Sequence, residues 1–515
     1  MHDRRMSPVD LGGAHLDLAV LAGAGVLLAA VAGVRLSSRL GVPSLLLYLG
    51  LGMLLGEDAI GVRFDDADLA RNVGLIALAL IVAEGGLTTD WATIRPVLPA
   101  AIALSTVGVA VSVAVMASIA HLVLGLGWRA AVVAGAVVSS TDAAAVFATL
   151  RSLRLPRRLV GALEAESGLN DAPVVMLATL LSTGHSGAGN IAAHVGYELA
   201  VGGAIGIGFG VLGVAGLRRA ALPAVGLYPI ATLGVAIASY AAAASAEASG
   251  FLAVYVTALV LGNTALPHRR ATLGFADGVA WLAQIGLFVM LGLLVTPSRL
   301  ASAVLPALAI AAALLLLARP LSVAVATLHL GRWGFGFGWA ERALVALAGL
   351  RGAAPIVLAT IPLSAHVTGA QRLFDVVFVL VAVLTLLQSP LLAPAARRLG
   401  LLDHDAGRDL DVEAAPLDRM LADLVTVTVG PRSRLHGVEV WELRLPPTAA
   451  VAFVVRAGEG FVPDRRTTLR HGDDLLVVTG RAERAAVEQR LRAVARDGRL
   501  AELPPPISPT RTRRR

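Results

Sequence analysis

The sequence predicts an all-α polytopic membrane protein with a small cytoplasmic α+β domain at its C-terminus. The chain has 515 residues, of which 56% are hydrophobic, and its mean hydropathy is +0.75. Soluble proteins are less apolar than this. Long apolar runs recur from about residue 15 to residue 396, and the composition turns polar and acidic after Arg397 and Arg398. These observations separate a membrane domain, residues 1–400, from a second domain.

The apolar runs are close to the length that crosses about 30 Å of hydrocarbon as a helix. The second and third runs are short. We predict about thirteen transmembrane helices, at residues 15–33, 43–56, 72–87, 97–124, 128–150, 159–183, 191–217, 226–246, 250–266, 278–296, 301–328, 342–362 and 373–396.

Arginine placement predicts the orientation in the membrane. The odd-numbered loops, such as the one that holds Arg157 and Arg158, carry many more arginines than the even-numbered loops. The positive-inside rule therefore places these loops and the C-terminal domain in the cytoplasm. Arg4 and Arg5 would then lie outside, against the rule. We expect a multi-pass protein of the cell membrane.

The region after the last run divides into a linker (401–416), a folded α+β domain (417–497) and a disordered basic tail (498–515). The net charge of +7 reflects the cytoplasmic loops and this tail, so no nucleic-acid partner is expected. The elements that we expect in the domain are strands at 424–429, 449–458 and 471–480, a short helix within "LHGVEVWEL", and a terminal helix at 481–495.

Two carboxylates lie deep within apolar runs. Asp142 follows Trp128 by about 21 Å of helix, and Asp171 follows Arg158 by about 20 Å, because a helix rises about 1.5 Å per residue. The two runs are antiparallel neighbours, so both carboxylates fall near the membrane midplane. An ionisable group there is expensive and usually functional.

Oxygen-bearing side chains accompany these two carboxylates along the chain. Oxygen donors without imidazole or thiolate suit a hard monovalent cation or a proton, so we predict a transporter rather than an enzyme. The chain has no cysteine, which excludes thiol chemistry and Cys-ligated metals. The accompanying residues are Ser139, Ser140, Thr141, Ser167 and Asn170.

Helical spacing separates the polar residues of the sixth run into two faces. Ser167 and Asp171 are four residues apart and share one face, whereas Glu166 and Asn170 form a second pair on an adjacent face. We expect Glu166 to have a cationic partner inside the protein. Arg351 is the candidate, since "AGLRGAAP" places it within the twelfth run.

Glycines and a proline around Arg351 would interrupt a regular helix, and the "SSTD" cluster indicates the same for the fifth run. Broken helices in corresponding positions of two halves point to an inverted-repeat transporter. We therefore expect inverted repeats with broken, crossing helices.

The motifs "SSTDAAAVF", "ESGLNDAP", "AEGGLTTD", "GFLAVYVTALVLGN", "FVMLGLLVTPS" and "GLRGAAP" resemble those of the NhaP-type monovalent cation/proton antiporters, and most closely the CvrA-like potassium/proton branch. The resemblance covers residues 15–396. It implies exchange of potassium, or also of sodium, for protons in pH, potassium and volume homeostasis, by a homodimer with alternating access. Ala83 departs from the family, whose members often have Phe there.

The resemblance also implies roles for individual residues. Asp171 would bind proton and cation in turn, with Asp142 at an unwound crossing. Thr141 and Ser167 would help to coordinate the cation, which makes these four residues the expected monovalent cation site. The Asn170–Asp171 order resembles the electroneutral members. Three residues would hold the core together: Asn170, Glu166 and Arg351.

Residues 417–495, with "GPRSRLHGVEVWELRLP" and "TLRHGDDLLVV", resemble a TrkA-C (RCK-C) regulatory module. We expect no cofactor. A nucleotide or a cyclic dinucleotide is the kind of regulator that this module would bind, although it contains no phosphate-loop signature.

Other interpretations remain open from the residues alone. Asp142 could cap a half-helix instead of binding a cation. Glu84, Glu164 and Arg319 receive no ligand role, and Arg319 could snorkel or pair with an acid. A sodium/proton antiporter, a ligand-gated cation channel or uniporter, and a membrane-anchored sensor are the alternative functions; no TVGYG-like filter supports a channel.

Overall fold

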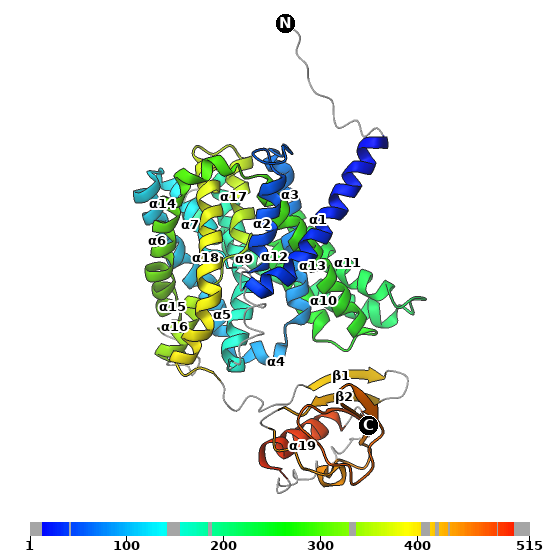
Figure 1. Ribbon diagram of the computed structural model, residues 1–515. Helices are drawn as coiled ribbons and strands as arrows, with labels where there is room; N and C mark the ends of the chain where they lie inside the picture. The colour runs from blue at the N-terminus through cyan, green and yellow to red at the C-terminus, as the bar shows by residue number, and fades with distance from the viewer. Residues whose placement is uncertain are drawn as a thin grey trace. The chain divides into compact units, whose positions relative to one another are not determined.

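A computed structural model describes residues 13–40, 43–141, 155–183, 188–328, 336–402, 412–417, 422–430, 433–480 and 483–498. The chain forms two compact units, Met1–Leu402 and Asp403–Arg515, which are considered separately. The first unit is a bundle of helices, and the second is built around a β-sheet (Figure 1).

The described elements of the first unit are helical throughout; η1 is a 3₁₀ turn, and η2 and η3 are π-helical turns. In chain order they are α1 (Gly13–Leu40), α2 (Ser44–Leu55), α3 (Ala67–Thr88), α4 (Trp91–Ile94), η1 (Arg95–Val97), α5 (Leu98–Ala103), η2 (Leu104–Gly108), α6 (Val109–Leu124), α7 (Trp128–Ser139), α9 (Arg157–Thr183), α10 (Ala188–Arg219), α11 (Leu227–Ser245), α12 (Gly250–Gly262), α13 (Arg269–Leu293), α14 (Pro297–Ala313), η3 (Leu314–Ala318), α15 (Arg319–Leu328), α16 (Trp339–Ala348), α17 (Ala353–Ser364) and α18 (Ala370–Arg398).

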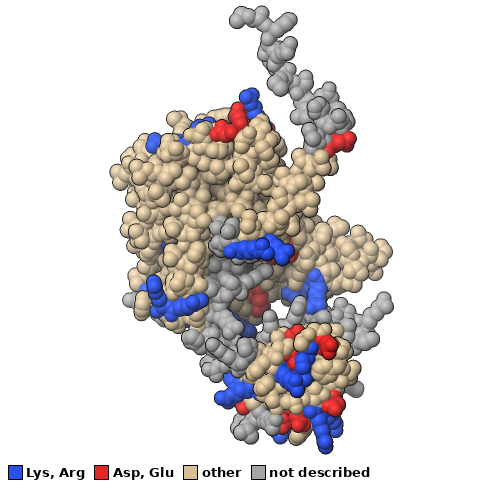
Figure 2. Space-filling model, viewed as in Figure 1, with Lys and Arg blue, Asp and Glu red and all other residues tan. Residues whose placement is uncertain are grey.

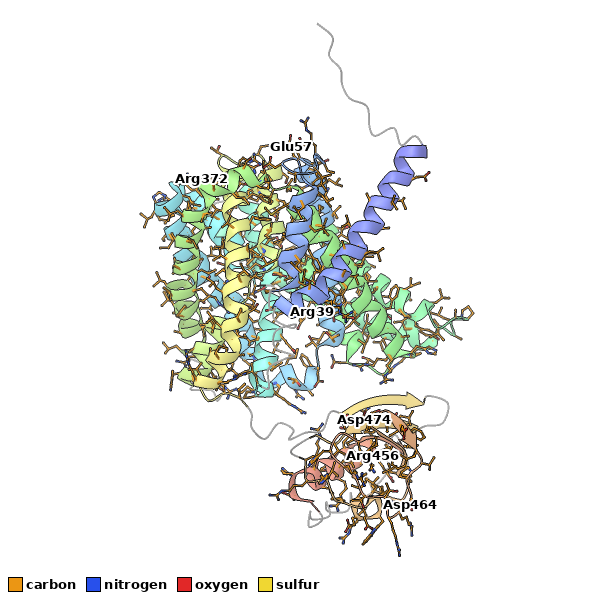
Figure 3. The ribbon with its side chains drawn as sticks, viewed as in Figure 1. Arg39, Glu57, Arg372, Arg456, Asp464 and Asp474 are labelled. Carbon is orange, nitrogen blue, oxygen red and sulfur yellow. The ribbon has the colours of Figure 1, made fainter. Side chains whose placement is uncertain are left out.

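The bundle is that of a polytopic membrane protein, as predicted. Eight described helices are long and apolar enough to span a membrane, and α16 with α17 makes a ninth span bent by 55°. Shorter apolar helices (α2, α7 and α12) and the polar-centred α9 occupy the remaining predicted runs. Uncharged side chains cover most of the side of the bundle in Figure 2. Glu57 and Arg372 lie at the same end of it, apart from each other (Figure 3).

The same order of elements occurs twice in the bundle. A helix interrupted by a π-helical turn (α5, η2, α6) leads to a helix that stops within the bundle (α7) and then to the long α9. The series α14, η3, α15 leads likewise to the broken pair α16 and α17 and then to the long α18, which packs against α14 and α17.

The two series run in opposite directions. Arg372, at the start of α18, donates a hydrogen bond to the carbonyl of Leu124, at the end of α6. Arg158, at the start of α9, donates to the carbonyl of Gly336, just before α16. The long helix α18 thus begins beside the start of α7, and the long helix α9 begins beside the start of α16. This exchange between the two series is the inverted repeat that the sequence predicts.

Close helix crossings in the bundle depend on glycine. A Cβ built on Gly52 of α2 would lie 2.1 Å from the carbonyl oxygen of Val289 on α13. A Cβ on Gly292 of α13 would lie 2.3 Å from the carbonyl oxygen of Leu49. Small residues allow backbones to approach closely where lipid removes the hydrophobic drive for packing. These two glycines therefore set the contact between α2 and α13.

The second unit contains a five-stranded antiparallel sheet in the order β1-β2-β5-β3-β4. Its buried core includes Val427, Val477 and Leu491, so α19 contributes to the same core as the central strands. Its elements are β1 (Val412–Leu417), β2 (Ala422–Thr428), the 3₁₀ turn η5 (Val440–Leu443), β3 (Ala450–Arg456), β4 (Glu459–Phe461), β5 (Asp474–Gly480) and α19 (Arg484–Asp497).

The expected strands and terminal helix of this unit are present within a few residues of their predicted bounds. β1 is an addition: it pairs with β2, and all of it except Leu417 falls in the range 401–416 that the sequence assigns to a linker. Alternation of apolar and polar residues is weak in "VEAAPL", so the pattern gives no strand signal there. Residues 499–515, expected to form a disordered tail, lie outside the described residues.

Candidate functional site

Asp171 lies at the centre of the bundle, on α9, with 3% of its surface exposed. The helix α7 ends at Ser139, and the extended backbone of Ser140 brings its hydroxyl to the carboxylate. Ser140 Oγ donates to Asp171 Oδ1 over 2.8 Å. Asp142, expected beside it, lies outside the described residues.

Thr141, Ser167 and Asn170 meet on the same side of this contact. The hydroxyls of Thr141 and Ser167 lie 3.3 Å apart, and the amide of Asn170 donates to Thr141 Oγ1. All three side chains are buried. The end of α7 is therefore joined to α9 by hydroxyl and amide contacts, and predicted residues from two helices are brought together around Asp171.

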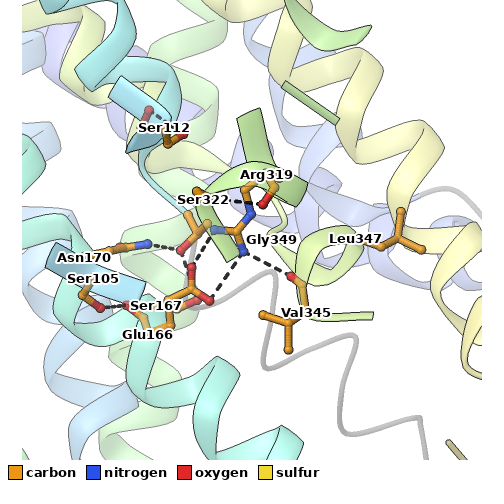
Figure 4. A network of polar contacts seen from close by, with 12 residues as sticks. Ser105, Ser112, Glu166, Ser167, Asn170, Arg319, Ser322, Val345, Leu347 and Gly349 are labelled. Carbon is orange, nitrogen blue, oxygen red and sulfur yellow. Dashed lines mark hydrogen bonds and ion pairs between the residues drawn. The ribbon is translucent and has the colours of Figure 1, made fainter. Parts of the chain in front are cut away.

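Glu166 forms a buried ion pair, but its partner is Arg319 and not the expected Arg351. Arg319 Nη1 lies 2.7 Å from Glu166 Oε1, and both side chains are almost fully buried (Figure 4). Arg319 Nη2 also donates to the carbonyl of Val345 over 3.2 Å. Arg319 can reach Glu166 for a steric reason, since a Cβ on Gly349 would lie 2.5 Å from Arg319 Nε. This glycine makes room for the guanidinium.

Arg351 occupies the break between α16 and α17 and is 1% exposed. Its carbonyl accepts a hydrogen bond from Thr385 on α18. Among the described residues, none of its three guanidinium nitrogens has a hydrogen-bond partner. Arg351 does interact electrostatically with Glu166 and Asp171. Its charge therefore balances the two carboxylates from a distance.

Two other buried polar residues bind backbone carbonyls around this centre, and neither was singled out from the sequence. Gln388 of α18 donates to the carbonyls of Leu347 and Gly349, at the end of α16. Ser105, in the π-helical turn η2, donates to the backbone carbonyl of Glu166. Buried polar side chains in an apolar run are the signal that could have identified them.

The helices α9, α10, α11 and α12 enclose a cavity of about 690 Å³ next to this centre. Ala172, the neighbour of Asp171, lies at one end of the cavity wall. His194 and Glu198 of α10 also line it, and their side chains form a contact of 3.0 Å. Glu247 adds a second carboxylate. The cavity wall is mostly apolar, and it reaches from these charged groups to the residue next to Asp171.

The arrangement can hold a small cation against oxygen atoms and can exchange it for a proton on one carboxylate. In the described part of the chain, no three histidine or acidic side chains gather as a metal-binding group. Hydroxyl and carboxylate oxygens favour hard ions. Broken helices, an inverted repeat and a buried polar centre at the break together define an ion transporter.

Comparison with known proteins identifies the family. The model of the sodium/hydrogen exchanger family, transmembrane region, matches residues 26–398. The K(+)/H(+) antiporter NhaP of Alkalimonas amylolytica is 35% identical over 486 residues, which are 91% of this chain and 82% of that protein. The K(+)/H(+) antiporter NhaP2 of Shewanella oneidensis is 36% identical over 86% of this chain and 78% of that protein. The chain belongs to the sodium/hydrogen exchanger family.

A solved structure agrees in fold. The sodium proton antiporter MjNhaP1 from Methanocaldococcus jannaschii at pH 8 superimposes with a TM-score of 0.62 at 21% identity, covering 74% of this chain and 99% of that one. Its membership in the sodium/hydrogen exchanger family makes the protein a multi-pass membrane transporter and not an enzyme.

Proposed function

We propose that the protein exchanges potassium for protons across a membrane, with Asp171 as the group that binds both. The observation that carries the proposal is the burial of this carboxylate against the hydroxyl of Ser140. The names of the relatives, which are potassium/proton antiporters, support potassium as the cation.

The mechanism follows from competition at one site. A deprotonated Asp171 attracts a dehydrated cation, with Thr141 and Ser167 as further oxygen ligands and Asp142 as a second carboxylate. A protonated Asp171 is neutral and can change its side of exposure without a cation. One proton for one monovalent cation makes the cycle electrically silent. Arg351 and the Glu166–Arg319 pair keep the surrounding charges balanced.

Exchange in liposomes tests this proposal. The purified protein, reconstituted with a trapped pH dye, should move protons when potassium is added, with the voltage clamped. Asp171→Asn should abolish this movement, and retained exchange in Asp171→Asn would refute the role of the carboxylate. Sodium in place of potassium tests the alternative cation. Current that follows the cation alone, without proton movement, would indicate a channel or uniporter.

The second unit is proposed as a TrkA-C regulatory domain on the cytoplasmic side of the cell membrane, in a homodimer. The arginine-rich odd loops, by the positive-inside rule, and the α+β fold of the unit support this assignment. A nucleotide or cyclic dinucleotide is the proposed class of regulator. Removing residues 410–515 and measuring exchange against pH tests whether the unit regulates transport.

A further inference from the structure

The aromatic ring of Tyr255, on α12, lies directly on Gly168 of α9. Tyr255 is 2% exposed. A Cβ built on Gly168 would lie 2.4 Å from Cε2 and 2.7 Å from Cζ of the ring. No side chain fits at these distances, so the ring occupies the space that any residue other than glycine would need.

This contact closes one end of the cavity. On α9, Ala172, Val175 and Thr179 line the cavity, and Gly168 continues the same helical face by one further turn. On α12, Phe251 lines the cavity and Tyr255 follows it by one turn. The lining therefore stops on both helices at the level where the ring meets the glycine.

Polar groups are found again beyond the ring. Glu164 lies one turn from Gly168 toward the Arg157 end of α9, and its side chain is partly exposed. The Tyr255 hydroxyl is buried and has no hydrogen-bond partner among the described residues. The ring thus separates the cavity, which holds His194, Glu198 and Glu247, from the Glu164 carboxylate on its other side. Asp171 lies three residues from Gly168, at this boundary.

We propose that the Tyr255–Gly168 contact is the barrier that shuts Asp171 off from the Arg157 end of α9 while the cavity side is open. The inference rests on the proposed function, because an exchanger must expose its carboxylate to one side at a time. A hydrated cation cannot pass a closely packed ring, so α9 and α12 must separate at this contact before the ion leaves toward Glu164.

The absence of cysteine makes the test direct, since one introduced thiol is the only thiol in the chain. Val175→Cys reports on the cavity and Glu164→Cys on the far side of the ring. A membrane-impermeant thiol reagent is applied to right-side-out and to inverted membrane vesicles. With Tyr255 present, each cysteine should react from one side only, and the two sides should be opposite.

Tyr255→Ala should make both cysteines react from both sides. With Tyr255 in place, the conformer that exposes a cysteine to the opposite side should have a population of about 10% or less. Removal of the ring should then raise the labelling rate from that side about tenfold or more. Tyr240→Ala is the matched control, because Tyr240 also lines the cavity and stacks edge-on against Phe251 at 5.3 Å. It should leave the sidedness unchanged. Tyr255→Phe keeps the ring and should also leave it unchanged.

Two results would refute the proposed barrier. One is labelling of Val175→Cys from both sides with Tyr255 in place. The other is labelling from one side only in a folded protein that carries Tyr255→Ala. If Tyr255→Ala does not fold, Gly168→Ala decides the question, since its methyl group displaces the ring. It should open the same two-sided labelling, and unchanged sidedness would contradict the proposal. Labelling requires no transport, so a failure of potassium exchange with intact sidedness would refute the proposed function alone.

Discussion

Arg319 and Glu166 form a buried ion pair that joins the start of α15 to the middle of α9. Arg319 directly follows the π-helical turn η3, and Ser105 of the other π-helical turn, η2, donates to the carbonyl of Glu166. π-helical turns are frequent at functional sites. A residue within one π-helical turn and a residue directly after the other thus both contact Glu166, five positions before Asp171.

Replacing Arg319 by Gln should destabilise the bundle strongly. The change leaves the Glu166 carboxylate buried without its partner, and breaking one side of a buried pair costs about 3–5 kcal/mol. Thermal unfolding in detergent, followed by size-exclusion chromatography, measures the loss. Glu57→Gln is the control, since Glu57 forms an exposed pair with Arg63 and should change little. A stronger coupling of Glu166 to Arg351 than to Arg319 in double-mutant cycles would contradict the assignment.

The choice between the two arginines marks the limit of what the sequence predicts here. Both stand in apolar runs, and the spacing on α9 shows only that Glu166 needs a cation. The partner is decided by the space beside Gly349, which lies far from Arg319 and Glu166 in the sequence, although it is close to Arg351. By contrast, the shared face of Ser167 and Asp171 follows from local helical spacing. Asn170, which the spacing places with Glu166 on an adjacent face, meets Ser167 at Thr141 through a contact between helices that spacing alone does not predict.

Ser140→Ala should weaken cation binding. The hydroxyl holds the Asp171 carboxylate in place, and a hydrogen bond to a charged group contributes about 1.5–3 kcal/mol. Since about 1.4 kcal/mol is a factor of ten, we expect KM for the cation to rise about tenfold. Initial rates of exchange over a range of potassium concentrations measure this.

Ser112→Ala is the matched control for Ser140→Ala. The hydroxyls of Ser112 and Ser139 lie 3.0 Å apart, and Ser139 donates to the carbonyl of Gly135, so this second contact remains after the change. We expect KM to stay close to the original value. Equal changes in KM for the cation from the two substitutions would show that the Ser140 hydroxyl makes no particular contribution to cation binding.

Hydropathy predicted each apolar run of the bundle because the length and polarity of a span are local properties. Packing partners are not local. No local pattern pairs Tyr255 with Gly168, because the two residues lie on separate helices and belong to different motifs. The strand β1 was missed for a similar reason, since its place is set by pairing with β2 and not by its own pattern.

Gly292→Ala should destabilise the contact between α2 and α13. The added methyl group would meet the carbonyl oxygen of Leu49 at 2.3 Å, which is backbone and cannot rotate away. Overpacking of this kind costs about 1–3 kcal/mol. Gly286→Ala is the control on the same helix, because a Cβ there meets nothing within 4 Å. Comparable melting temperatures for the two variants would exclude a tight crossing.

The second unit should lose stability in acid through Asp473. Its carboxylate is fully buried and accepts hydrogen bonds from Arg456 Nε and Nη2, at 2.8 and 2.7 Å, and from the backbone N–H of Arg470. Burial alone would raise the pKa of Asp473, but these hydrogen bonds and the positive charge of Arg456 outweigh it and lower the pKa.

The lowered pKa of Asp473 means that the second unit loses stability as the pH falls. Because the pKa of Asp473 is lower in the folded chain, its stabilising contribution is fully present above the ordinary value of about 3.9 and is lost as the pH falls through the folded-state value. Asp473→Asn should therefore destabilise the unit by about 1.5–3 kcal/mol at about pH 7, and by less at about pH 3.

Hydrogen exchange of the β3 and β5 amides in the full-length protein, measured by mass spectrometry, tests this expectation. At each pH the variant is compared with the unchanged chain, so the intrinsic pH dependence of exchange cancels. Asp497→Asn is the control, since Asp497 forms an exposed contact with Arg496 on the last turn of α19. A difference between Asp473→Asn and the unchanged chain that stays the same at both pH values would mean that the charge of Asp473 does not stabilise the sheet.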